Sequence, residues 1–504
     1  MARPKRAIDE EFAMSATRRT AEEIHSRIDH PIIDADGHMI ESIPILMDYL
    51  QQTLGSEAWS RMSREPAWRL TFGSDSWEST SESERRAEWM LAAPWWGVPT
   101  RSRDRATALL PGLLADRLDE LGIDFTVVYP TLCNFGLSLA DDELRRGACR
   151  AFNTFLADAV RDHADRMTCP ALIPMHTPEE ALAELDFVTE TLSMRCIVIS
   201  GYVRRSLADT RGGAEAALGA GREHFDVFAI DSDYDYDPFW ARCQELGVAV
   251  TTHSGSQGLG FRQSPTRYMY NHIGHFAASH EALAKALIFG GVPKRFPDLN
   301  FGFLEGGAGW AAMLYSDLFE RWEKRGGSNI HQLDPARVDW REMDQLLAAH
   351  GGSRFADPAL RESLRQHQTG RPPELDDFAE SGIERREDIR DLFVSRFFFG
   401  CEADDRSAAW AFAERYHACE ARFQAMLGSD LGHWDVPDMR DVIPEAYEFV
   451  DQELMSSADF RDFACDNVLR LHAGMNPEFF AGTRVEAYAK DFLGNQRAAG
   501  STGV

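Results

Sequence analysis

The sequence of 504 residues lacks the features that mark secreted or membrane proteins. No stretch approaches the ~18 uninterrupted apolar residues of a membrane span, and no apolar segment follows the basic N-terminus as it would in a signal peptide. The eight cysteines are scattered, without a Cys-x-x-Cys pair. Scattered cysteines in a large acidic chain are typical of reduced, mostly buried thiols. We therefore expect a cytoplasmic protein.

Positive charge is also scarce. The chain has 53 lysines and arginines against 81 acidic residues, which gives a net charge of −28. Such a chain repels the phosphates of nucleic acids and the anionic surface of a membrane. The acidic residues are spread along the chain, so they indicate solubility and no particular partner. We expect a small-molecule substrate and a homo-oligomer, a dimer.

What the sequence does contain is a regular alternation of apolar runs and helical patterns. Alternation of this kind is typical of α/β folds with a parallel sheet. The eight expected strands are 32–33, 125–129, 171–175, 196–200, 248–252, 301–304, 396–400 and 424–428. The helices expected between them include 113–121, 149–164, 178–192, 237–246 and 280–289.

Polar residues of the kinds that bind metals stand at the ends of three of these runs. Asp36 and His38 follow the first run with a spacing of two, which places both side chains on one face of a strand. His253 follows the fifth run and Asp430 the eighth. Any one of these residues, considered alone, is more simply explained as a solvated turn carboxylate or a packed structural histidine. Together they predict a metal site, because strands one, five and eight meet only if the sheet closes into a (β/α)8 TIM barrel.

A barrel of this kind needs about 250 residues, so about half of the chain is additional. The expected parts are an N-terminal helical extension (1–30, with a helix over 8–28), the barrel domain (31–482) and a C-terminal tail (483–504). The expected insertions are a Trp-containing lid or oligomer element (about 56–111), a Gly/Ala-rich segment (207–231) and a solvated cap with helices (326–388).

Several short motifs resemble those of the amidohydrolase superfamily, in the branch that contains aminocarboxymuconate-semialdehyde decarboxylase and related metal-dependent hydrolases. The resemblance covers about residues 30–482 and is specific for fold and metal, but not for substrate. The motifs are Asp34–Glu41, Thr252–Gly255, Phe296–Asn300, Phe303–Gly307, Gly428–Asp430 and Asn467–Leu471.

The resemblance implies that Asp36, His38, His253 and Asp430 ligate a divalent metal ion. Two carboxylates and two imidazoles suit Zn²⁺, Mn²⁺ or Fe²⁺. The fourth run ends at Ser200, without the Lys or Glu that bridges two metals in binuclear relatives, so we expect one ion. Such an ion lowers the pKa of a bound water to roughly 7, and Asp430 is expected to act as a base as well as a ligand.

The chain departs from the family pattern after the sixth run. Many members, including the decarboxylases, have His-x-Gly there, and this chain has Glu305-Gly306. Glu305 is a candidate ligand or general acid/base, and the alternative is a structural carboxylate paired with an arginine. The substitution favours hydrolysis by a metal-activated water over nonoxidative decarboxylation. A non-catalytic metabolite-binding barrel is a third alternative, which the intact ligand set disfavours.

Further candidates lie on the loops after the fourth and fifth runs. His275 is expected to reach the mouth of the barrel as a catalytic residue, and Tyr268 to stack on a planar ring. Arg204, Arg262 and Arg267 are candidates for holding a substrate carboxylate bidentately. Each is alternatively an ordinary surface or packing residue. The set predicts a small, cyclic or aromatic, carboxylated substrate.

Three acidic residues beside the motifs have two interpretations each. Asp34 shares the face of Asp36 and His38, and either supports a ligand or is purely structural. Glu41 is a candidate for orienting a ligand imidazole. Glu402, after the seventh run, either faces the mouth of the barrel or caps the next helix.

Overall fold

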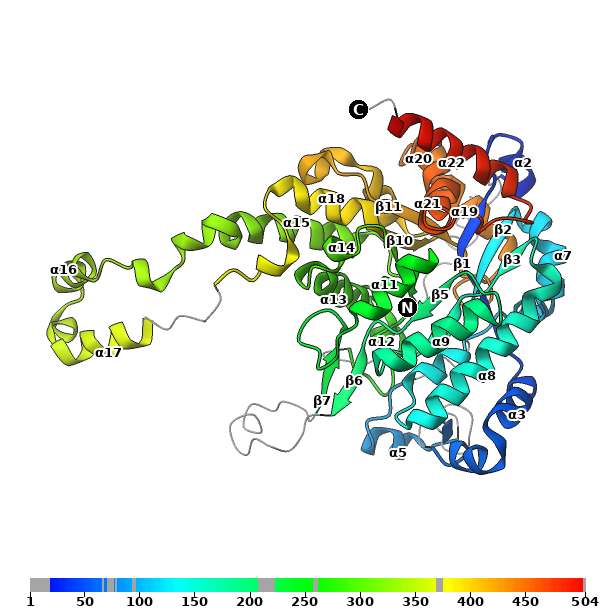
Figure 1. The fold of residues 1–504 in the computed structure, drawn as a ribbon, viewed down its shortest axis with the longest axis horizontal. Coiled ribbons are helices and arrows are strands. Elements are labelled where there is room, and N and C mark those ends of the chain that lie inside the picture. Colours follow the sequence, from blue (N-terminus) through cyan, green and yellow to red (C-terminus); the bar gives the residue numbers. More distant parts are fainter. Residues whose placement is uncertain are drawn as a thin grey trace, which may run out of the picture.

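The structure is a computed structural model of the chain. It describes residues 19–65, 68, 69, 77, 79–92, 97–206, 223–256, 262–368 and 375–501. Within those ranges, no helix is both long and apolar enough to cross a membrane. Figure 1 shows helices around a central set of strands, with a long arm projecting to one side.

The eight apolar runs all form strands of a parallel (β/α)8 barrel. β1 pairs with β2 and β2 with β3, and a second parallel sheet has the order β4-β5-β8-β9-β10-β11. β1 continues beyond its predicted run, through both Asp36 and His38. The strands are β1 Ile33–Met39, β2 Phe125–Pro130, β3 Met167–Thr168, β4 Ala171–Ile173, β5 Ile197–Ile199, β8 Val250–Thr252, β9 Phe301–Phe303, β10 Phe397–Glu402 and β11 Gln424–Gly428.

The third strand position of the barrel is divided into β3 and β4. Cys169 and Pro170 separate the two pieces, and a proline has no N–H group to donate to a neighbouring strand. β3 pairs with β2, while β4 pairs with β5. Both neighbours of this position therefore have a partner, although the ladder between them is interrupted.

β1 and β11 belong to separate sheets, and two backbone hydrogen bonds link β1 to the segment that follows β11. The N–H of Asp430 donates to the carbonyl of Asp36 at 2.9 Å, and the N–H of His38 donates to the carbonyl of Leu431 at 2.9 Å. These two backbone hydrogen bonds bring three of the predicted metal ligands to one edge of the barrel.

Asp34 strengthens this link between the two sheets. A bulge in β1 shifts its register against β2 just after Asp34, and the fully buried Asp34 carboxylate fills the gap. It accepts hydrogen bonds from the Asp36 N–H (3.1 Å), the Thr126 hydroxyl (2.7 Å), and the N–H (2.9 Å) and hydroxyl (2.7 Å) of Ser429. Asp34 is thus structural and joins β1, β2 and β11.

The helices begin and end at residues that favour helix termini. α9 follows Thr177, whose hydroxyl accepts from the Glu180 N–H in a reciprocal capping box. α7 begins with Pro111 and ends at Gly122, where φ is 78°. The helices are α2 Ala21–His25, α3 Ile43–Met62, α5 Glu82–Ala87, α6 Ser102–Leu109, α7 Pro111–Leu121, α8 Asp142–Val160, α9 Pro178–Glu190, α11 Asp237–Leu246, α12 Tyr268–His272, α13 His275–Phe289, α14 Val292–Arg295, α15 Gly309–Arg325, α16 Trp340–His350, α17 Pro358–Gln368, α18 Arg386–Arg396, α19 Val442–Asp451, α20 Ser457–Arg461, α21 Asn467–His472 and α22 Glu486–Ser501.

Three predicted helices begin at least five residues away from their predicted first residue. α8 begins at Asp142 instead of 149, because the Asp141 side chain caps its first turn. α13 begins at His275 instead of 280, directly after Gly274 in a left-handed conformation. Of the N-terminal helix predicted over 8–28, only α2 is helical in the described part, and residues 8–18 lie outside it.

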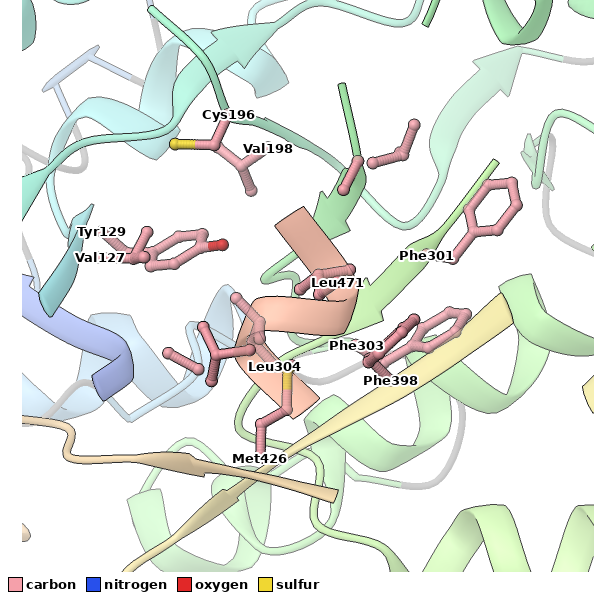
Figure 2. Packing of buried hydrophobic residues seen from close by; sticks show 14 of the residues in the cluster. Val127, Tyr129, Cys196, Val198, Phe301, Phe303, Leu304, Phe398, Met426 and Leu471 are labelled. Atoms are coloured by element: carbon pink, nitrogen blue, oxygen red, sulfur yellow. The ribbon is translucent and has the colours of Figure 1, made fainter. Parts of the chain in front are cut away.

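The barrel interior is filled by large apolar side chains. Figure 2 shows side chains from β2, β5, β9, β10 and β11 gathered around Leu471 of α21. The Asn300 side chain donates to the carbonyl of Leu471 at 3.1 Å just before β9 begins. α21 therefore closes the barrel at the amino ends of its strands. Seven cysteines are buried and Cys419 is partly buried, all without disulfides, as the sequence predicts.

The insertions differ in form. The first contains α5 and α6; most of the second, 207–222, lies outside the described residues. Beside the second lies an unpredicted antiparallel hairpin, β6 Val203–Ser206 with β7 Glu223–Asp226. The third carries α16 and α17, but it projects from the barrel as an arm and is no cap over it (Figure 1). It joins α15 to α18, which leads into β10.

Candidate metal centre

β1 presents Asp36 and His38 together at the carboxyl end of the barrel. Both side chains are buried, and the residue between them has to be glycine. A Cβ atom on Gly37 would lie 2.6 Å from Asp34 Oδ2 and 2.7 Å from Thr126 Oγ1. The Asp-Gly-His motif therefore combines two ligand residues with the close approach of β1 to its neighbours.

The four predicted ligands converge. His38 Nε2 lies 3.4 Å from Asp36 Oδ1 and 3.4 Å from Asp430 Oδ1. His253 Nε2 lies 3.6 Å from Asp36 Oδ2. The structure thus brings together residues from β1 and from the ends of β8 and β11, as the sequence predicts.

These spacings fit a metal ion. Metal–ligand bonds of about 2.1 Å place neighbouring ligand atoms about 3.0–3.4 Å apart in an octahedral or tetrahedral shell. Nε2 of His38, Nε2 of His253 and Oδ1 of Asp36 are buried, and none has a hydrogen bond among the described residues. Burying such groups without a partner is costly, and a shared cation would satisfy all three.

Glu305, directly after β9 and Leu304, lies beside this set. Its Oε2 atom is 3.0 Å from His253 Nε2, and its side chain is only 4% exposed. Burial, and then the charge of Asp435, raise the pKa of Glu305 well above its ordinary value. In the described part of the chain no arginine pairs with it; its partner there is His253.

Glu305 and Asp430 also have unusual backbones. Their φ angles are 58° and 48°, in the left-handed region where a residue other than glycine costs roughly 1–2 kcal/mol. Strain of this kind clusters at functional sites. Here it turns two carboxylates towards the same group of histidines.

Sequence reasoning missed His433. Its ring stacks on that of His38, with 4.0 Å between centroids. Its Nδ1 lies 2.7 Å from Asp430 Oδ1, and its Nε2 lies 2.9 Å from the Thr131 hydroxyl. Burial lowers the pKa of His433 to about 4. Its position three residues after Asp430, on the same loop, is the signal that would have found it.

A cavity of about 830 Å³ opens above these residues. Tyr268, His275, Phe276 and Trp434 line it, so His275 and Tyr268 lie where the sequence predicts. His275 Nε2 lies 3.0 Å from Nδ1 of His272, and burial lowers the pKa of His275 to about 3. The cavity has aromatic walls over a floor of histidines and carboxylates.

The three predicted arginine anchors are placed differently. Arg204 lines the cavity, but its guanidinium pairs with Glu223 across the β6–β7 hairpin. Arg267 is exposed and lines a separate hollow with Trp77, not the cavity. Arg262 does not line the cavity, although its charge contributes to the low pKa of His275.

Glu41 does not orient a ligand imidazole. Its carboxylate accepts hydrogen bonds from the N–H groups of Leu132 (2.8 Å) and Cys133 (3.0 Å). It therefore holds the turn after β2. At the end of β5, Ser200 lines the cavity and offers no carboxylate or amine.

Comparisons with known proteins add the following. The sequence matches no curated protein. A dihydroxybenzoic acid decarboxylase from Polaromonas sp. JS666, solved with manganese and 2-nitroresorcinol, is 15% identical with a TM-score of 0.46, over 90% of this chain and 99% of that one. A 5-carboxyvanillate decarboxylase from Sphingomonas paucimobilis is 15% identical with a TM-score of 0.47, over 88% and 98%. An amidohydrolase from Mycobacterium avium subsp. paratuberculosis K-10 is 16% identical with a TM-score of 0.48, over 88% and 99%.

At these identities and TM-scores, the three solved structures do not indicate the substrate or the reaction of this chain. The family comparison is stronger, because it covers most of the chain, including all four predicted ligands. The model of the amidohydrolase family matches residues 33–472, and this chain therefore belongs to that family.

Proposed function

We propose that this amidohydrolase-family member is a metal-dependent enzyme that removes carbon dioxide, without oxidation, from a small planar carboxylic acid. The charge of the cavity lining is the observation that favours decarboxylation over hydrolysis. Arg204 is paired with Glu223, and the cavity lining of the described residues contains no other arginine or lysine. A substrate carboxylate in this cavity would therefore find its positive charge at the metal centre.

Asp36, His38, His253 and Asp430 would hold one divalent ion, with Zn²⁺, Mn²⁺ and Fe²⁺ as candidates. Such an ion would supply the charge that binds the carboxylate and stabilises the electrons left when carbon dioxide departs. A carboxylate bound at the centre is itself the reacting group. Hydrolysis of the same acid would need a separate anchor, which the described lining does not offer.

Glu305 is the proposed proton donor. As the bond between the substrate carbon and its carboxyl group breaks, the electron pair stays on that carbon and takes the proton from Glu305. The buried Oε2 atom beside His253 supports this role, since burial favours the protonated acid. His275 stays a candidate for proton transfer. Tyr268, Phe276 and Trp434 would contact the faces and edge of a planar ring.

Hydrolysis, which the sequence alone favours, is the second candidate. The observation in its favour is the same carboxylate: Glu305 or Asp430, when ionised, would serve as a base for an attacking water. A neutral substrate would need no arginine anchor in a cavity of about 830 Å³.

Turnover in ¹⁸O-water separates the two reactions. The substrates would be hydroxylated benzoates, including 2,6-dihydroxybenzoate and 5-carboxyvanillate, together with neutral esters of the same rings. We expect one carbon dioxide per turnover, no ¹⁸O in the organic product, and deuterium on the ring in D₂O. Label in the organic product without carbon dioxide would establish hydrolysis instead.

Glu305→Gln tests the proton donor in the same assay. The variant should keep the ion held by Asp36, His38, His253 and Asp430, and lose about 10²–10⁴-fold in turnover, the usual contribution of a general acid. Glu414→Gln, at an exposed position, is the matched control. Unchanged turnover in Glu305→Gln would remove this residue from the mechanism.

A further inference from the structure

A second group of carboxylates lies next to the candidate metal centre. Glu305, Glu402, Asp430 and Asp435 each place one oxygen so that all four atoms lie within 4.8 Å of one another. They come from the ends of β9, β10 and β11, three neighbouring strands of the barrel. None of the four is adjacent in sequence to His38 of β1 or to His253, which follows β8.

The group has no positive partner. Among the described residues, no lysine or arginine forms an ion pair with any of these four carboxylates. Glu305 lies beside His253, and Asp430 beside His433. The side chains of Glu305 and Asp430 are 4% and 3% exposed. Four carboxylates this close repel one another strongly unless protons or a cation neutralise them.

Asp430 belongs both to a group with His38 and to the group of four carboxylates. Its Oδ1 faces Nε2 of His38 at 3.4 Å and Nδ1 of His433 at 2.7 Å. Its Oδ2 is buried and has no hydrogen-bond partner in the described part of the chain. With Oδ1 directed to the first set, Oδ2 is left for a second ion. Asp430 is the natural bridge between the two sets.

We propose that Glu305, Glu402 and Asp435, with Asp430 as a bridging ligand, form a second divalent-cation site. Its donors are all oxygen, which suits Mn²⁺, Mg²⁺ or Ca²⁺, whereas the first site includes two imidazoles and suits softer ions as well. The expectation of a single ion rests on Ser200 at the end of the fourth strand. The second site uses other strands, so Ser200 does not exclude it. A carboxylate that ligates this ion is ionised, so Glu305 donates a proton in the proposed reaction only when the second site is empty.

Manganese binding to the full-length protein tests this site. After the purified protein is stripped of metal and titrated with Mn²⁺, the bound ion is counted from the electron paramagnetic resonance signal of free Mn²⁺. We expect two ions per chain, and a spectrum broadened by coupling between two ions at saturation.

The double variant Glu402→Gln/Asp435→Asn should bind one ion per chain and show the six-line spectrum of an isolated Mn²⁺. Asp404→Asn, an exposed carboxylate beside Glu402, should keep two. Circular dichroism verifies folding, and if the double variant does not fold, Glu402→Gln alone should weaken the second binding step at least tenfold. One ion per chain in the folded wild type, or two coupled ions in the double variant, would overturn the proposal.

Discussion

His253 belongs to both parts of the candidate centre. Its Nε2 lies 3.6 Å from Asp36 Oδ2 and 3.0 Å from Glu305 Oε2, without a hydrogen bond among the described residues. A neutral imidazole in this position has one lone pair to give to a metal. Its removal therefore affects the first ion directly, while the carboxylates remain.

His253→Ala should weaken binding of the first ion more than about 100-fold, since even a residue that only supports a ligand contributes 10–100-fold. Turnover should be lost together with that ion. Metal content after gel filtration, by elemental analysis, is the measurement, and His331→Ala at an exposed position is the control. Full activity in the variant would place the metal centre elsewhere.

At the scale of elements, the joint between β1 and β11 depends on one buried carboxylate. Asp34 accepts four hydrogen bonds, from its own strand, from β2 and from the segment after β11. The link between the two sheets and the positions of Asp36, His38 and Asp430 depend on this joint. A change at Asp34 should therefore affect both stability and metal binding.

Asp34→Ala should lower the free energy of unfolding by about 3–5 kcal/mol, because several buried donors lose their acceptor at about 1–3 kcal/mol each. Asp34→Asn should cost less, since its side-chain carbonyl still accepts from the backbone. Urea unfolding of the metal-free proteins gives both values. Equal stability of wild type and Asp34→Ala would show that the joint does not need this carboxylate.

The projecting arm with α16 and α17 exposes apolar side chains that a second chain could cover. None of residues 331–366, which belong to its described part, is buried. Leu333, Leu346 and Leu360 are exposed there. Contact between α16 and α17 includes the Arg365–Asp344 ion pair at 3.1 Å. Short helices with exposed apolar faces gain most of their stability from packing. The predicted dimer would supply that packing if each arm contacts the other chain.

Replacing residues 328–375 by a short Gly-Ser linker should convert the predicted dimer to a monomer. The two ends of the arm are close, because the Gly327 N–H donates to Asp376 at 2.8 Å. Metal content should be unchanged, since the arm contributes none of the candidate ligands. Light scattering gives the mass, and an unchanged dimer would exclude the arm as the contact.

At the scale of the whole molecule, histidines buried in the neutral form make stability depend on pH. Away from the metal centre, His472 is buried against Phe479, with ring centroids 4.4 Å apart. Burial lowers the pKa of His472 from 6.5 to about 3. Between these values the unfolded chain binds a proton that the folded chain does not, so this group destabilises the fold as pH falls from 6.5 towards 3.

Unfolding of His472→Phe should take up about one proton fewer than unfolding of the wild type. Its free energy of unfolding should therefore fall less steeply below pH 6, by roughly 1.4 kcal/mol per pH unit. Urea unfolding of the metal-free protein at pH 4.5, 5.5 and 7 measures the slope. His350→Phe, at an exposed site, should leave the slope unchanged. The same slope in His472→Phe as in wild type would show that His472 accepts its proton while folded.

Local pattern alone determined much of this molecule. The alternation of apolar runs and helices predicts all eight strand positions, because burial on both faces requires apolar residues wherever a barrel strand runs. The spacing of Asp36 and His38 predicts their common face. Motifs at the strand ends predict the family, which the match over residues 33–472 confirms.

Only the tertiary structure decided which side chains meet. Asp34 and Ser429 are 395 positions apart, yet they are joined by hydrogen bonds, and no periodicity encodes such a pair. The stacking of His433 on His38, the pairing of Arg204 with Glu223 and the group of four carboxylates have the same origin. Loop conformation and strand register fix these contacts, because charges attract, repel and share ions according to distance in space and not along the chain.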